Sequence, residues 1–171
     1  RPLGPAQQPA LIYMHGGGWV LGSVNTHDGI TAGIAKEANL TVISVNYSLS
    51  PEHPYPAALE DVQATTAWVL ANASQLGVDP RRLMIGGDSA GGNMAAVLCQ
   101  KYRDENGHIP YCFQLLVYPV TDTSMSQPAY KDHEFAPFLN LAEMQFFFAT
   151  YCADAAQLQH PYVAPIKAAS L

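Results

Sequence analysis

The chain of 171 residues is about one domain long, and with 49% apolar and 13% charged residues it has enough hydrophobic material for a packed core. This composition excludes an intrinsically disordered chain, because disorder requires low hydrophobicity and many charges. Eight Lys and Arg residues against 14 Asp and Glu residues give a net charge of −6, which argues against nucleic acid or an anionic membrane surface as a partner. No apolar run approaches the roughly 20 residues that are needed to span a bilayer.

Four short apolar segments are predicted to be strands. The first, at 9–14, ends at three glycines, and the second, at 40–47, is β-branched and ends at a Pro-rich turn. The other two lie at 83–87 and 113–119. Continuous apolar runs of this length are typical of strands that are covered on both faces, as in a parallel sheet.

Segments with helical periodicity alternate with these strands. Residues 27–38 follow Thr26, the expected N-cap, and residues 57–75 and 90–103 place apolar side chains on one helical face. Strand–helix alternation predicts βαβ units with right-handed crossovers, and therefore an α/β fold with a mostly parallel sheet.

The chain changes character after Val120. Residues 121–140 are polar and contain two prolines, which predicts a long loop or lid. Asn140 and Glu143 have the spacing of a capping box, which predicts a helix that begins at Leu141. Two interpretations of this helix stay open: it docks an apolar face on the core, or it is a cap helix that lines a ligand pocket with Phe146, Phe147 and Phe148.

The cysteines and histidines do not form a metal-binding pattern. Cys99, Cys112 and Cys152 are far apart and suggest neither a zinc site nor a set of disulfides. This use of cysteine favours a reducing compartment, and we expect a cytoplasmic location. The six histidines and the acidic residues lack metal-ligand spacing, so we expect no metal site.

A Gly-Asp-Ser-Ala-Gly-Gly stretch at 87–92 lies directly between the third predicted strand and the third predicted helix. It is a G-x-S-x-G motif in a strand–turn–helix context, which places Ser89 on a strained turn at the carboxyl edge of the sheet. Gly87 and Gly91 would let strand and helix pass closely, and the helix N-terminus would direct its amides toward charge beside Ser89. The alternative is a glycine-rich turn that only packs strand on helix.

A His-Gly-Gly-Gly-Trp stretch at 15–19 follows the first predicted strand. Because glycine lets backbone N–H groups approach a ligand oxygen closely, the amides of Gly16 and Gly17 are predicted to form an oxyanion hole with that of Ala90. A phosphate cradle is the rival interpretation of such a loop, but neither G-x-G-x-x-G nor Gly-Lys-Ser/Thr follows it.

These motifs resemble those of the hormone-sensitive-lipase family of α/β-hydrolases, which includes the bacterial family IV esterases. The resemblance covers nearly the whole chain, in the family's order, and rests on residues 15–19, 46–53, 56–61, 87–93, 118–119 and 164–167. It implies an α/β-hydrolase fold, with a mostly parallel sheet flanked by helices. A partial hydrolase core would occupy residues 1–120, and a cap or lid segment with the aromatic helix would occupy residues 121–171.

The resemblance also implies roles for single residues of the two motifs. Ser89 would be the nucleophile that the predicted oxyanion donors serve. His15 would orient the glycine loop, which runs to Gly18, through hydrogen bonds of its side chain rather than act as a base. Asp88 would be a buried structural carboxylate.

The family places its catalytic acid and histidine after two further strands, for which this sequence has no counterpart. We therefore expect the sequence to be the central portion of a longer hydrolase, truncated at both ends and completed by further polypeptide from the same or another chain. Asp122, after the fourth predicted strand, and His133, in the polar loop, are the substitute acid and base that the sequence offers. The alternative is that His133 is an ordinary solvated side chain.

The expected activity is hydrolysis of short to medium acyl esters by a serine carboxylesterase through an acyl-enzyme. The expected partner is a small-molecule ester, no organic cofactor is needed, and assembly with further copies is compatible with the sequence. Two alternatives stay open. One is a non-catalytic ligand-binding protein on the same scaffold, as in the plant gibberellin receptors that resemble this family, and the other is an inactive fragment.

Overall fold

Four parallel strands form the centre of the computed structural model, which describes residues 7–170. Their spatial order is β2-β1-β3-β4, with bounds β1 (Gln8–Met14), β2 (Thr41–Val45), β3 (Val78–Asp88) and β4 (Phe113–Val117). All four predicted strands are confirmed. The third begins earlier than expected, because Val78 already pairs with Gln8 before the register between β1 and β3 shifts.

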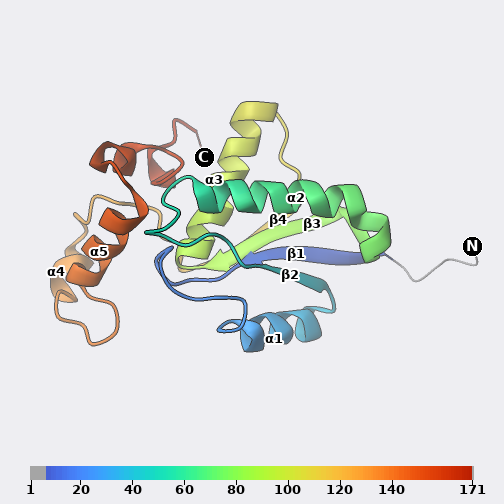
Figure 1. Ribbon diagram of the computed structural model, residues 1–171, viewed down its shortest axis with the longest axis horizontal. Helices are drawn as coiled ribbons and strands as arrows, with labels where there is room; N and C mark the ends of the chain where they lie inside the picture. Colours follow the sequence, from blue (N-terminus) through green and yellow to red (C-terminus); the bar gives the residue numbers. More distant parts are fainter. Residues whose placement is uncertain (1–6, 171) are drawn as a thin grey trace, which may run out of the picture.

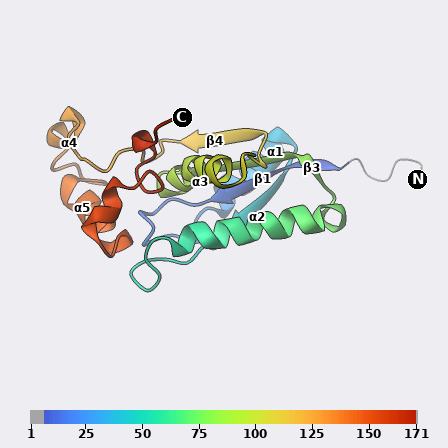
Figure 2. The ribbon, with the colours of Figure 1, turned by 90° about the horizontal axis from the view of Figure 1, so that it is seen from above.

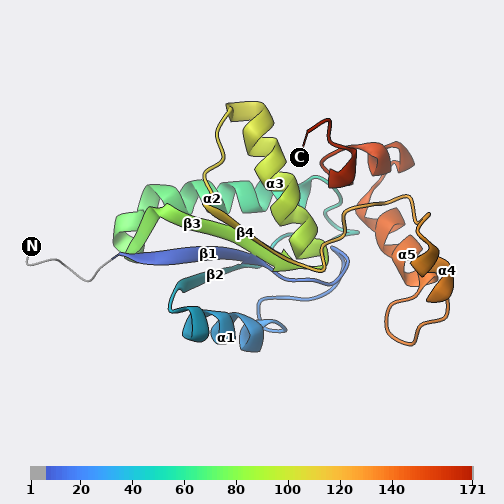
Figure 3. The same cartoon turned by 180° about the vertical axis from the view of Figure 1, so that it is seen from behind.

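Three long helices cover the two faces of this sheet. Helix α1 (Asp28–Ala38) lies on one face, while α2 (Ala57–Leu76) and α3 (Ala90–Asn106) lie on the other, as Figures 1, 2 and 3 show. The chain leaves β1 through α1 toward one edge of the sheet and leaves β3 through α3 toward the other. The carboxyl ends of β1 and β3 therefore form a switch point, which is where open α/β sheets bind ligands.

The start of α1 differs from the sequence-based prediction. His27 rather than Thr26 is the N-cap, and its side chain makes no capping hydrogen bond. Thr26 Oγ1 instead donates to the Ser23 carbonyl at 2.8 Å and accepts the Ser23 amide at 2.9 Å. Because this local turn occupies its hydroxyl, Thr26 closes the loop before the helix and does not cap it.

The strands differ in how fully they are covered. Ala10 through Met14 of β1 are buried, as expected for a strand between two layers. Among residues 7–170, β4 is an edge strand with Phe113 57% and Leu116 39% exposed. The expectation of cover on both faces thus holds for the central strand, while residues 7–170 cover β4 only in part.

The part of the chain after β4 lies largely beyond the carboxyl ends of the strands (Figure 1). It contains two helices and two 3₁₀ turns, namely α4 (Pro128–Asp132), α5 (Leu141–Tyr151), η1 (Ala155–Gln159) and η2 (Pro165–Lys167). The polar stretch predicted as a loop therefore includes one short helix. The domain boundary expected at residue 120 stays a prediction.

The capping box that begins α5 is confirmed. Asn140 Oδ1 accepts the Glu143 amide, and Glu143 Oε2 accepts the Asn140 amide, both at 2.9 Å. The helix buries Met144, Phe148 and Tyr151, and the Tyr151 ring stacks on Trp19 with centroids 4.3 Å apart. No helix within the described part of the chain is long and apolar enough to cross a membrane.

Candidate active site

Ser89 occupies the turn between β3 and α3 with φ 52° and ψ −115°, a conformation that residues other than glycine rarely adopt. Its amide donates to the Val117 carbonyl and its own carbonyl accepts the Asn93 amide, both at 2.9 Å. These bonds tie the turn to β4 on one side and to the first turn of α3 on the other. The strained turn that the motif predicts is therefore present.

Two glycines allow the turn to pack against the end of β1. A Cβ atom on either Gly87 or Gly91 would overlap the carbonyl oxygen of Met14. Because that oxygen belongs to a buried central strand, close packing prevents it from shifting to make space for a Cβ atom. The spacing of the motif thus has a steric cause, since both glycines let the β3–α3 turn approach β1.

Ser89 is half-buried and lines a cavity of about 1120 Å³. The cavity lies between the glycine loop at residues 16–18 and the segment after β4, and most of its wall is apolar, including Trp19, Leu21, Ile30, Val120, Met144 and Phe147. This size is at or slightly above the upper end of the roughly 300–1,000 Å³ that is usual for small-molecule pockets. Phe147 of α5 closes onto Gly18, where an added Cβ would overlap its ring.

The glycine loop shows that one predicted oxyanion donor is wrong. The Gly16 amide donates to Asp88 Oδ1 at 3.1 Å, so this N–H is directed at a buried carboxylate and not at a ligand. The N–H groups of Gly17 and Gly18, at φ 120° and 60°, have no hydrogen-bond partner among residues 7–170, and both residues line the cavity with Ser89. Gly17 and Gly18 are therefore the residues of the loop whose amides are free for a ligand among residues 7–170.

Ala90 is the first residue of α3 and is fully buried. The first amides of a helix have no partner within the helix, and the described residues supply none for Ala90. Its N–H therefore stays a candidate third donor beside Ser89, as predicted.

Asp88 is buried at 6% exposure and joins three parts of the structure. Its Oδ1 atom accepts the Tyr13 hydroxyl at 2.8 Å as well as the Gly16 amide, and its Oδ2 atom lies 3.4 Å from His27 Nε2. Burial and the hydrogen bond to Asp88 raise the pKa of Tyr13, so the phenol keeps its proton and donates. The geometry is that of the structural carboxylate the resemblance implied.

His15 supports the glycine loop from behind. Its Nδ1 atom lies 2.8 Å from the Gly16 carbonyl, its own carbonyl accepts the Tyr47 hydroxyl at 2.7 Å, and its ring stacks on that of Tyr47 at 4.3 Å. Burial lowers the pKa of His15, so the neutral ring donates from Nδ1 to the loop. His15 makes no hydrogen bond to Ser89, in agreement with an orienting role.

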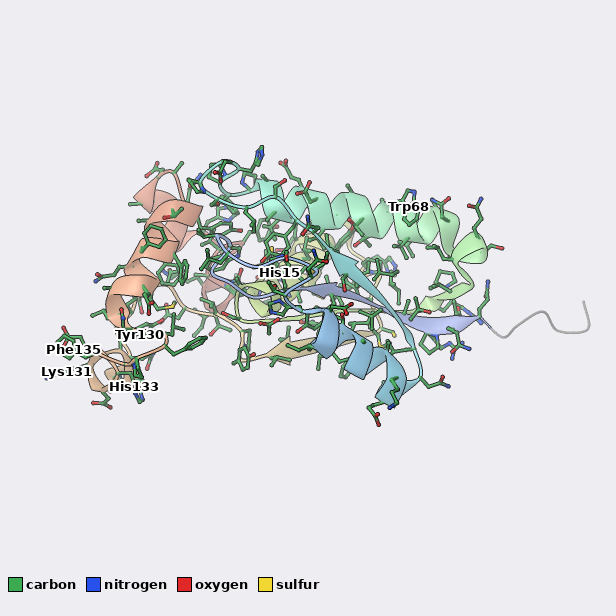
Figure 4. All side chains as sticks on the ribbon, turned by 60° about the horizontal axis from the view of Figure 1, so that its bottom comes forward. His15, Trp68, Tyr130, Lys131, His133 and Phe135 are labelled. Atoms are coloured by element: carbon green, nitrogen blue, oxygen red, sulfur yellow. The ribbon has the colours of Figure 1, made fainter. Side chains whose placement is uncertain are left out.

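The predicted substitute acid and base do not form a pair. Asp122 and His133 both line the cavity, but Asp122 accepts the Ser124 amide at 2.9 Å and the Ser124 hydroxyl at 2.6 Å. These two bonds lower the pKa of Asp122. His133 is exposed and lies at the α4 end of the molecule beside Lys131 and Phe135, well away from His15 (Figure 4). No hydrogen bond joins Asp122, His133 and Ser89 within residues 7–170.

His27 is a site residue that no motif indicated. It was expected only as the first residue of a helix, yet its ring reaches Asp88 across 61 positions of sequence and lines the cavity. A lone histidine at a helix start carries no local signal for such a contact. Among the described residues, no group of three His, Cys, Asp or Glu side chains is placed to hold a metal ion.

Comparison with known proteins gives consistent matches over nearly the whole chain. A family with the α/β-hydrolase fold matches residues 11–171. The carboxylesterase NlhH of Mycobacterium tuberculosis is 46% identical over 143 residues, which are 84% of this chain and 44% of that protein. Esterase LipI of the same organism is 44% identical over 149 residues, 87% of this chain and 46% of LipI.

A solved structure matches the same region in space. The hyperthermophilic esterase of the archaeon Pyrobaculum calidifontis superposes with a TM-score of 0.90 at 38% identity, covering 98% of this chain and 56% of that one. The chain thus spans about half the length of the relatives that it matches.

Proposed function

The chain belongs to the hormone-sensitive-lipase family of α/β-hydrolases, and we propose that the whole protein is a serine carboxylesterase that acts on short to medium acyl esters. One observation carries this proposal. Ser89, on its strained turn, lines the same cavity as the unpartnered amides of Gly17 and Gly18. A nucleophile and oxyanion donors that share one cavity are what acyl transfer requires.

The proposed reaction begins when Ser89 Oγ attacks the ester carbonyl carbon and gives its proton to a general base. The carbonyl oxygen becomes an oxyanion that accepts the amides of Gly17, Gly18 and Ala90. Collapse of this intermediate expels the alcohol and leaves an acyl-enzyme at Ser89, which water then hydrolyses. No described residue hydrogen-bonds Ser89 Oγ. The proposal therefore takes the base and its acid from parts of the whole protein outside the described residues.

The cavity supports a neutral substrate with an apolar acyl group. Trp19, Met144 and Phe147 give its wall an apolar character, while the carboxylates of Asp122 and Glu143 would repel an anion. The ring of Phe147 against Gly18 narrows the space beside the loop amides. Short and medium acyl chains are therefore favoured over long ones.

The proposal is tested with the whole protein on p-nitrophenyl acetate and butyrate. Ser89→Ala is expected to lower kcat by about 10⁴-fold or more, because it removes the nucleophile. Ser74→Ala, at an exposed position on α2, is the matched control and is expected to leave kcat unchanged. A Ser89→Ala variant that keeps most of the activity would exclude this mechanism.

A fluorophosphonate probe separates catalysis from binding alone. An active hydrolase is expected to carry the probe on Ser89, as located by peptide mass spectrometry. If the cavity binds an apolar ester without hydrolysis and without labelling, the protein is a ligand-binding member of the fold.

A further inference from the structure

We propose that His27 is a positioning residue for the oxyanion loop. It holds the Asp88 carboxylate, which holds the Gly16 amide, and Gly16 in turn sets the position of the next two amides, those of Gly17 and Gly18. The inference rests on the proposed function for its catalytic consequence, whereas its structural part stands on contacts among these residues.

The backbone of His27 is anchored at the start of α1. Its carbonyl accepts the Thr31 amide at 3.0 Å and the Thr31 hydroxyl at 3.1 Å. The side chain is 18% exposed and projects from this anchored position toward the end of β3. The His27 ring therefore connects the start of α1 to the end of β3 from a fixed backbone position.

The contact with Asp88 requires a proton on His27 Nε2. An ionised carboxylate only accepts hydrogen bonds, and Oδ1 of Asp88 already receives Tyr13 and Gly16. Oδ2 lies 3.4 Å from Nε2 and has no other side-chain or backbone donor among the described residues. Without His27, this oxygen would lack a protein donor in a buried site, which is unfavourable.

The other ring nitrogen also has a partner. His27 Nδ1 lies 2.9 Å from Thr26 Oγ1, and the single hydroxyl proton of Thr26 is donated to the Ser23 carbonyl. Contacts at both ring nitrogens therefore fix the orientation of the His27 ring toward Asp88.

The chain of contacts ends at one residue of the loop. Asp88 fixes the Gly16 amide and His15 fixes the Gly16 carbonyl, so two side chains hold the residue that immediately precedes Gly17. Loss of the His27 donor would let Asp88 turn and would shift Gly17 and Gly18 with Gly16. Since an oxyanion exists only in the transition state, such a shift lowers kcat and leaves KM nearly unchanged.

Two substitutions that differ by one methylene group test this role in the whole protein. His27→Gln places a side-chain amide nitrogen near the position of Nε2 and keeps a donor for Asp88. His27→Asn keeps a polar group near Thr26 and is a favourable N-cap, so the fold is protected, but it does not reach Asp88. His108→Asn, at an exposed histidine before β4, is the matched control.

Kinetics provide the first measurement. His27→Asn is expected to lower kcat roughly tenfold, less than the 10²–10³-fold that removal of an oxyanion donor costs, with KM within about twofold. His27→Gln is expected to recover most of that loss, and His108→Asn to match the parent protein. Equal kcat values for His27→Asn and His27→Gln would overturn the inference.

The second measurement does not depend on activity. His15–Gly16 is the only His–Gly step in the sequence, so ¹³C-carbonyl histidine combined with ¹⁵N-glycine selects the Gly16 amide of this chain in an NMR spectrum. The Gly16 amide proton is expected to move upfield in His27→Asn, as its bond to Asp88 weakens, and to return in His27→Gln. An unmoved signal in His27→Asn would overturn the inference.

The two measurements separate the two proposals. If the Gly16 signal responds as expected but neither the parent nor any variant hydrolyses esters, the coupling of His27 to the loop is supported and the esterase function is rejected. If esters are hydrolysed through Ser89 and the Gly16 signal does not respond, the function is supported and the role of His27 is rejected.

Discussion

The Gly16 amide donates to Asp88 Oδ1 at 3.1 Å across 72 positions of sequence. The residue that precedes the nucleophile therefore holds the loop that follows β1. This bond occupies the Gly16 amide and anchors the residue that immediately precedes Gly17 and Gly18. One carboxylate thus links the geometry of the nucleophile turn to that of the oxyanion loop.

Replacing this carboxylate is expected to destabilise the fold. Asp88→Ala leaves the buried Tyr13 hydroxyl and Gly16 amide without their acceptor, and each unsatisfied group costs about 1–3 kcal/mol. The free energy of unfolding in urea is therefore expected to fall by about 2–6 kcal/mol. Asp132→Ala, at an exposed carboxylate, should change it by less than about 0.5 kcal/mol. Equal effects of the two substitutions would contradict the structural role of Asp88.

Glycine-to-alanine substitutions at two helical positions are expected to have opposite effects. In Gly91→Ala the new Cβ overlaps the buried Met14 carbonyl oxygen, so we expect the free energy of unfolding to fall by about 3 kcal/mol or more. In Gly29→Ala the new Cβ on α1 has no heavy atom within 4 Å. The higher helix propensity of alanine should therefore raise the free energy of unfolding by about 0.5–1 kcal/mol. Thermal unfolding followed by circular dichroism compares the two, and a tolerated Gly91→Ala would show that the close approach to β1 is not required.

Phe147 is expected to restrict the acyl chain. Its ring lies against Gly18 at the cavity wall, so Phe147→Ala opens space next to the loop amides. The ratio of kcat/KM for p-nitrophenyl octanoate to that for the acetate should rise roughly tenfold, a typical effect of a changed apolar pocket. Phe146→Ala, one residue earlier and 57% exposed, should leave the ratio unchanged. A similar rise in both variants would point to a general loosening of α5.

The three cysteines are expected to differ in reactivity. Burial raises the pKa of the Cys99 thiol to about 12 and that of Cys152 to about 11, whereas Cys112 is exposed. Because only the thiolate reacts, iodoacetamide at mildly alkaline pH should modify Cys112 in the folded protein and spare the other two. Peptide mass spectrometry locates the label, and early modification of Cys99 would show that its burial is transient.

The raised pKa values of the Cys99 and Cys152 thiols predict that the protein becomes less stable at high pH. Unfolded cysteines ionise near pH 8.5, while the folded protein keeps Cys99 and Cys152 protonated to higher pH. Their contribution to stability is therefore complete below the unfolded pKa and is lost as the pH rises through 11 and 12. The urea concentration at the midpoint of unfolding should therefore decrease as the pH rises through this range. The decrease should be less steep in Cys99→Ala than in the parent protein.

Local features of this protein follow from the sequence alone. The strand–helix alternation, the strained turn at Ser89 and the Asn140–Glu143 capping box depend on residues that are close in the chain, and the structure contains all three. The two glycines around Ser89 were also predictable, since their spacing reflects the contact between a strand and the helix that follows it. Such features need no knowledge of which strands are neighbours.

Tertiary structure decided which amides and side chains meet at the cavity. Because β1 and β3 are adjacent in the sheet, Asp88 lies against Gly16 and accepts its amide, so Gly17 and Gly18 are the proposed loop donors. The position of α1 on the sheet brought His27 to the same carboxylate. These contacts join residues 61 and 72 positions apart, and no periodicity or motif in the chain encodes a hydrogen bond at that separation.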